Sequence, residues 1–173
     1  MCIGSIMKTN DIQFMILRVV FLITFLVYLL LLLKVILFKA ASPFTMMDYL
    51  LDFNLKDFKR SLTLSSNFVP FKTISSYAFH TSNQNIVIRN VVGNIILFIP
   101  FGFLLPVIAG RKLNFVQLII SSFLLSLFLE LIQLFSRIGS FDVDDLLLNT
   151  LGAILGFFTL NVITKVIRHR VRK

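Results

Sequence analysis

Long apolar runs, separated by polar segments, dominate the pattern of hydrophobic and polar positions along the chain. They cover residues 19–33, 91–108, 115–135 and 146–163. The first run can be extended to Phe38 across Lys34. Each of the last three is about 18–21 residues long, enough to cross a hydrocarbon core of about 30 Å at a rise of about 1.5 Å per residue. The pattern predicts four transmembrane helices.

The first run has two interpretations. Lys8 and Arg18 precede it and the small residues 40–42 follow it, as in a secretory signal peptide. The apolar part of a signal peptide, however, is about 7–15 residues long, and this run is longer and interrupted by Lys34. We therefore interpret it as an uncleaved first transmembrane helix.

The connections between the predicted helices differ in length. Residues 39–90 form a long polar loop, whereas the connections at 109–114 and 136–143 are short. Short connections make neighbouring helices antiparallel. The sequence thus predicts an all-α integral membrane protein: a four-helix transmembrane bundle in a single domain (1–173), with a long loop between the first two helices.

Composition supports a membrane protein and excludes a nucleic-acid-binding one. The chain is 57% hydrophobic and 14% charged, whereas soluble domains are about 45–50% apolar and about 25% charged. Its 17 Lys and Arg residues outnumber 8 Asp and Glu, but they gather beside the apolar runs, where anionic lipid headgroups attract them. Cys2 is the single cysteine, and His80 and His169 are far apart, so no disulfide within the chain and no zinc-like cluster is expected.

Basic residues also bear on orientation, although they flank the two ends of the predicted helices in nearly equal numbers. Lys59 and Arg60 lie more than about 20 residues from either neighbouring helix, where the positive-inside rule weakens. Residues 165–173 place a dense basic run directly after the last helix. We therefore expect both termini in the cytoplasm.

In this topology the polar residues of the last three helices fall at one depth, near the outer face of the membrane. They are Asn90 and Asn94 in the second helix, Glu130, Gln133 and Arg137 in the third, and Asp142, Asp144, Asp145 and Asn149 at the start of the fourth. Those of the third helix continue a stripe from Ser122 and Ser126 at steps of three or four residues. Polar groups at bilayer depth point inward, so we expect one shared polar cluster.

The segment "FDVDDLLLNTLG" (141–152) has structural interpretations as well. Asp142 could cap the fourth helix, with Asp145 completing a box-like pair. Asp144 lies about 100° away around the helix, so one cap does not explain all three aspartates. Gly152 and Gly156 form a GxxxG motif, which favours close helix packing.

Glu130 is the strongest functional candidate. An acidic residue inside a transmembrane helix costs about 2.5–3.5 kcal/mol on insertion scales and is a functional hypothesis by default. Arg137, two turns further along the predicted stripe, could neutralise Glu130 or one of the aspartates. The alternative is a purely structural ion pair.

Three segments resemble the VanZ-like family of small bacterial membrane proteins: "NFVPFKTI" (67–74), "GNIILFIPFGFLLP" (93–106) and "ELIQLFSRIGSFDVDDLLLNTLGAILG" (130–156). The resemblance covers about half the chain, mainly residues 67–156. The resemblance implies a bacterial cytoplasmic membrane protein associated with resistance to the glycopeptide teicoplanin. It thus implies a resistance phenotype but no particular reaction. The family-type positions include Asn67, Asn94, Glu130, Gln133, Arg137, Asp142, Asp144, Asp145 and Asn149.

These observations leave three hypotheses. In the favoured one, the cluster protects the envelope by binding a cell-wall precursor, a lipid headgroup or a glycopeptide, through Asn67, Asn94, Gln133, Arg137, Asp142 and Asn149. In the second, the protein is an intramembrane enzyme: Glu130 with Asp144 or Asp145 supplies acid–base chemistry or binds a divalent cation such as Mg²⁺, Ca²⁺ or Mn²⁺, and Arg137 holds a lipid phosphate. The third is a structural scaffold, which does not explain Glu130 beside three aspartates.

Overall fold

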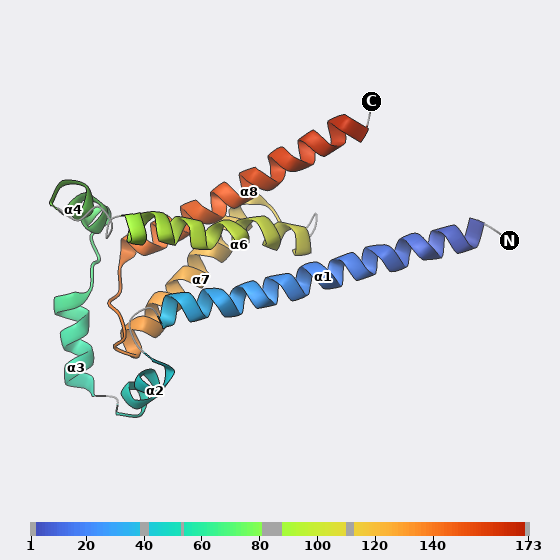
Figure 1. The fold of residues 1–173 in the computed structure, drawn as a ribbon. Helices are drawn as coiled ribbons and strands as arrows, with labels where there is room; N and C mark the ends of the chain where they lie inside the picture. The colour runs from blue at the N-terminus through green and yellow to red at the C-terminus, as the bar shows by residue number, and fades with distance from the viewer. Residues whose placement is uncertain (1–2, 39–41, 53, 81–87, 110–112, 172–173) are drawn as a thin grey trace.

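The computed structural model describes residues 3–38, 42–52, 54–80, 88–109 and 113–171. Its body consists of the long helices α1 (Ile3–Leu37), α6 (Gly93–Ala109), α7 (Phe115–Phe135) and α8 (Val143–Val171) (Figure 1). All four are long and apolar enough to cross a membrane. The predicted all-α membrane bundle is confirmed.

The segment between α1 and α6 contains more structure than the predicted loop. It forms α2 (Pro43–Leu51), α3 (Leu55–Arg60), the π-helical turn η1 (Ser61–Ser65), α4 (Lys72–His80) and the π-helical turn η2 (Ile88–Val92). Local capping explains two of the starts: the Thr45 N–H donates to Ser42 Oγ at α2, and the Lys56 N–H donates to Asn54 Oδ1 at α3.

Close packing of α6 against α8 forms the centre of the bundle. A Cβ atom added to Gly102 would lie 1.8 Å from the Ala153 carbonyl oxygen, and one added to Gly156 would lie 2.0 Å from that of Ile99. Only glycine permits backbones to approach this closely. The GxxxG segment therefore packs helices together, as the sequence predicted.

Helix α1 joins this pair through an apolar core. Leu32 of α1, Phe98 and Phe101 of α6, Leu129 of α7 and Ala153 of α8 form one buried cluster. The Tyr28 hydroxyl donates to the Leu97 carbonyl oxygen at 2.8 Å and ties α1 to α6. Toward the two chain ends, α1 and α8 diverge from the bundle (Figure 1), and the described side chains at 12–13, 15–20 and 161–170 are exposed.

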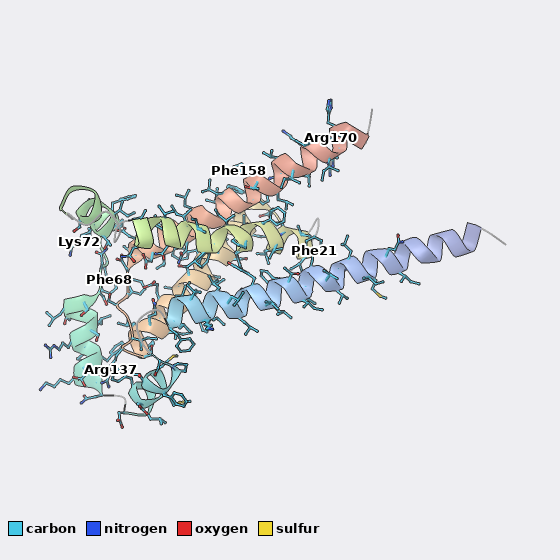
Figure 2. The ribbon with its side chains drawn as sticks, in the orientation of Figure 1. Phe21, Phe68, Lys72, Arg137, Phe158 and Arg170 are labelled. Atoms are coloured by element: carbon cyan, nitrogen blue, oxygen red, sulfur yellow. The ribbon has the colours of Figure 1, made fainter. Side chains whose placement is uncertain are left out.

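The short helices all lie at one end of the bundle, opposite the two chain ends (Figure 1). Phe68, Lys72 and Arg137 lie at this end and Arg170 at the other (Figure 2). The end of α1, the start of α6, the end of α7 and the start of α8 meet here. The sequence therefore brings its polar helix ends together at one place.

Candidate functional site

The segment at residues 67–74 docks against the start of α8. The Asn67 N–H donates to the Phe141 carbonyl at 2.7 Å, and the Val143 N–H donates to the Asn67 carbonyl at 3.0 Å. The Asn67 side-chain amide donates to Asp142 Oδ1 at 2.9 Å. Phe68 stacks on Phe141, with ring centroids 5.1 Å apart. These contacts join residues of two motif segments that are at least 73 positions apart in the sequence.

Asp144 holds the start of α4 in the same junction. Its fully buried carboxylate accepts the backbone N–H groups of Phe71, Thr73 and Ile74, the last two at 2.8 and 3.1 Å. Phe71 has a φ of 65°, a left-handed conformation that is uncommon outside glycine. Successive N–H groups in such a turn form a concave anion site, strengthened here by the positive end of a helix. Asp144 is thus an internal anchor for the 67–74 segment.

Asp142 has two structural roles. Its Oδ1 accepts the Asp144 N–H at 2.9 Å, which is the capping role predicted for it. Its Oδ2 accepts a hydrogen bond from the Thr73 hydroxyl at 2.7 Å. Thr73 was not among the predicted site residues, although its place in the "NFVPFKTI" motif pointed to it.

A cavity of about 330 Å³ lies beside this junction, between the four long helices. Its polar lining consists of Asn94, Glu130, Gln133, Asp145 and Asn149. Its apolar lining includes Val35 and Ile36 of α1, Ile96 and Leu97 of α6, and Leu129 of α7. Five predicted site residues thus share one cavity.

Each of three polar side chains in the cavity wall is held by a hydrogen bond to a neighbouring segment. Glu130 is 3% exposed, and its Oε2 accepts the Asp142 N–H at 2.9 Å. Asn149, 4% exposed, donates to Ser126 Oγ at 2.8 Å, while its Oδ1 is buried without a hydrogen-bond partner. Gln133 donates to the Ile36 carbonyl at 3.1 Å and ties α7 to α1. The wall is therefore preorganised.

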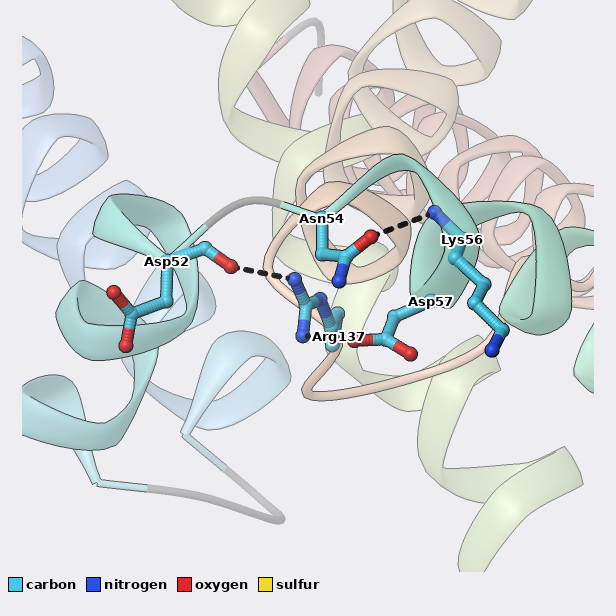
Figure 3. A network of polar contacts seen from close by, with 5 residues as sticks. All are labelled: Asp52, Asn54, Lys56, Asp57 and Arg137. Carbon is cyan, nitrogen blue, oxygen red and sulfur yellow. Dashed lines mark hydrogen bonds and ion pairs between the residues drawn. The ribbon is translucent and has the colours of Figure 1, made fainter.

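The prediction that Arg137 continues the α7 stripe toward Glu130 is wrong. Helix α7 ends at Phe135, and Arg137 adopts a φ of 53°, which turns the chain away from the helical path. Its guanidinium pairs with Asp57 at 3.1 Å and donates to the Asp52 carbonyl at 2.8 Å (Figure 3). It also lies 5.8 Å from the centre of the Tyr49 ring. Arg137 therefore fastens α2 and α3 to the end of α7.

The predicted cluster is thus divided into three neighbouring units. Asn94, Glu130, Gln133, Asp145 and Asn149 line the cavity, Asn67, Asp142 and Asp144 form the junction, and Arg137 belongs to the α2–α3 contact. In the described part of the chain, no three His, Cys, Asp or Glu side chains converge as a metal-binding group. What the cavity offers chemically is two carboxylates and three amides beside an apolar wall.

Comparison with known proteins identifies the family of this chain. The family model described as VanZ/LLP1 matches residues 25–164, a stretch that contains every residue lining the cavity. The chain belongs to the VanZ/LLP1 family. Protein VanZ of Enterococcus faecium is 32% identical to it over 93 residues, which are 50% of this chain and 57% of that protein. The chain therefore spans little more than half the length of this VanZ relative. No solved structure matches the chain.

Proposed function

We propose that this VanZ/LLP1 protein acts at the outer face of the cytoplasmic membrane, where its cavity binds an envelope lipid or a lipid-linked cell-wall precursor. Such binding would protect the cell against teicoplanin-type glycopeptides. The observation that carries the proposal is the cavity itself: Glu130 and Asn149 are held in the wall of a membrane-spanning bundle, next to apolar side chains. Ionisable groups at this depth are costly to insert, and polar side chains converging on a largely apolar cavity are typical of a binding site.

The proposed orientation is supported by charge. The cavity is lined by the end of α1, the start of α6, the end of α7 and the start of α8. Arg137 follows the end of α7 at the end of the bundle opposite Arg170 (Figure 2). The basic run 165–173 belongs on the cytoplasmic side by the positive-inside rule. The cavity end would then face outward, where wall precursors and glycopeptides meet the membrane.

Teicoplanin susceptibility tests this proposal. The protein is expressed in a susceptible Gram-positive host, and the minimal inhibitory concentration of teicoplanin is measured for the wild type, Glu130→Gln and an empty vector. Glutamine retains an oxygen for the Asp142 N–H, so the fold should persist while the charge is lost. We expect Glu130→Gln to restore the susceptibility of the vector control at unchanged protein level.

The matched control is Asp48→Asn, which removes a carboxylate from an exposed position of α2 outside the cavity. It should protect as well as the wild type. Full protection by Glu130→Gln, or equal loss with Asp48→Asn, would exclude a role for the cavity in resistance.

One observation favours the enzyme alternative: Glu130 and Asp145 line the same cavity, and paired carboxylates are suited to acid–base catalysis. Mass spectrometry of lipids from cells with the wild type, Asp145→Asn and the vector separates the two functions. An enzyme should produce a lipid species that is absent from both the Asp145→Asn and the vector cells. Identical lipid profiles would leave binding as the function.

A further inference from the structure

The charged side chains among the described residues of the cavity wall are the carboxylates of Glu130 and Asp145. Glu130 receives one hydrogen bond, at Oε2, and no described residue donates to its Oε1. Gln133 uses its side-chain N–H₂ on the Ile36 carbonyl. Among the described residues that line the cavity there is no lysine or arginine.

Asn149 adds an independent sign of a missing partner. It is 96% buried, since 4% of it is exposed, and its N–H₂ is engaged with Ser126. Its Oδ1 is buried with no hydrogen-bond partner. The great majority of buried hydrogen-bond acceptors in proteins have a partner, so an unpaired one calls for an explanation. A donor supplied by a ligand in the cavity provides it.

The ligand group that fits such a wall carries N–H donors and a positive charge. A primary ammonium has three donors and no acceptor, so it can donate to more than one acceptor of the wall at once. A phosphate presents only acceptors and would meet the carboxylate of Glu130 unfavourably. The chemistry of the wall thus selects a cationic headgroup over an anionic one.

Two apolar side chains at the edge of the cavity indicate which kind of molecule carries the ammonium group. Val35 of α1 and Ile96 of α6 line the cavity, and 46% and 57% of these residues are exposed. Both belong to membrane-spanning helices. An occupant in the cavity can therefore extend past these two side chains toward the acyl chains of the bilayer.

We infer that the cavity binds the primary ammonium group of a membrane amphiphile. Glu130 supplies the countercharge, Asn149 supplies a neutral acceptor, and the Val35–Ile96 edge accommodates the apolar part. The inference rests on the proposed function and specifies the chemistry of its ligand.

Lipid retention tests the inference. The full chain is placed in nanodiscs of phosphatidylglycerol that contain either phosphatidylethanolamine or N-acetylated phosphatidylethanolamine, and the lipids retained after release are counted by native mass spectrometry. The wild type should retain the ammonium lipid over the acetylated one by at least about tenfold, because charge-assisted hydrogen bonds are about twice as strong as neutral ones. Glu130→Gln should abolish this preference.

Two further variants keep the test decisive. Asn149→Leu removes the unpaired acceptor and should lower retention without removing a charge, whereas the exposed-site control Asp48→Asn should retain lipid as the wild type does. Equal retention of the two lipids by the wild type, or an unchanged preference in Glu130→Gln, would overturn the inference. Displacement of the lipid by millimolar soluble ethanolamine would overturn the membrane-amphiphile part.

The outcome is separable from that of the proposed function. If Glu130→Gln abolishes protection from teicoplanin but keeps the lipid preference, the cavity functions and the ammonium inference fails. If Glu130→Gln loses the lipid preference while protection is unchanged, the ammonium site stands and the resistance proposal fails.

Discussion

At the residue scale, the three neighbouring aspartates have different tasks. Asp142 caps α8 and binds Asn67 and Thr73. Asp144 is buried on backbone N–H groups at the start of α4, and Asp145 lines the cavity with Glu130. A short acidic run can therefore serve one structural junction and one cavity wall at once, because successive helical residues point about 100° apart.

Replacing Asp144 should release the 67–74 segment. In Asp144→Asn the side-chain N–H₂ faces backbone N–H groups, so at least one buried donor loses its partner, at a cost of about 1–3 kcal/mol. We expect trypsin to cleave after Lys72 in detergent-solubilised Asp144→Asn much faster than in the wild type. Asp48→Asn serves as the control, and an unchanged cleavage rate in Asp144→Asn would contradict the anchoring role.

Two substitutions of Glu130 should distinguish a loss of stability from a loss of function. Glu130→Gln keeps an acceptor for the Asp142 N–H, whereas Glu130→Leu leaves that N–H unpaired and should lower stability by about 1–3 kcal/mol. Thermal unfolding in detergent compares the two variants. If Glu130→Gln is as unstable as Glu130→Leu, the residue is structural and its functional interpretation is lost.

At the element scale, glycine positions set how closely α6 and α8 approach. Gly102 contacts the Ala153 backbone, and Gly152 and Gly156 contact the backbone of α6. The predicted helix bounds were accurate where polar residues mark an end: the prediction of 115–135 agrees with α7, which begins directly after its N-cap Asn114 and has Gln117 in its first turn as the second member of a capping box. Periodicity and caps are local, so the sequence alone reveals them.

A methyl group at Gly102 tests this packing. Gly102→Ala should force α6 and α8 apart and cost about 1–3 kcal/mol, the usual penalty for overpacking a core. Gly93→Ala is the matched control for stability, because a Cβ there would meet nothing within 4 Å. Unfolding temperatures that fall equally in both variants, or in neither, would contradict the assigned contact.

The Arg137 contact shows what sequence pattern alone could not reveal. Arg137 follows Gln133 by four residues, a spacing that places both side chains on one helix face only if α7 continues. The left-handed conformation of Arg137 interrupts the helical path, so the spacing no longer predicts where its side chain lies. Its partner Asp57 belongs to a segment with no apolar periodicity, so no local signal joined the two residues. A long-range pair that forms through an irregular turn can be identified only from the three-dimensional structure.

Arg137 should therefore control the order of α2 and α3 rather than the cavity. Asp57 is 47% exposed at its side chain, so Asp57→Ala should cost less than about 1 kcal/mol. Arg137→Ala also loses the contacts with the Asp52 carbonyl and the Tyr49 ring, so it should lower the stability by more than Asp57→Ala does. The rate of amide hydrogen exchange in residues 43–60 measures the order of α2 and α3 in each variant, with Lys56→Ala as the control. Faster exchange in Asp57→Ala than in Arg137→Ala would contradict the assignment.

At the scale of the whole molecule, the bundle is polarised. The short helices lie at one end, and the start of α1 and the end of α8 lie at the other (Figure 1). The cavity is lined by the helix ends that meet beside the short helices. The central claim is that the cavity end faces outward. Cysteine labelling of intact cells tests it, because Cys2 is the single native cysteine and can be replaced by serine.

The measurement compares Ser140→Cys, at an exposed position between α7 and α8, with Arg168→Cys, near the end of α8. A membrane-impermeant maleimide is applied before and after permeabilisation. The account predicts that Ser140→Cys reacts in intact cells and that Arg168→Cys reacts only after permeabilisation. The reverse pattern would place the cavity on the cytoplasmic side and contradict the proposed action at the outer face.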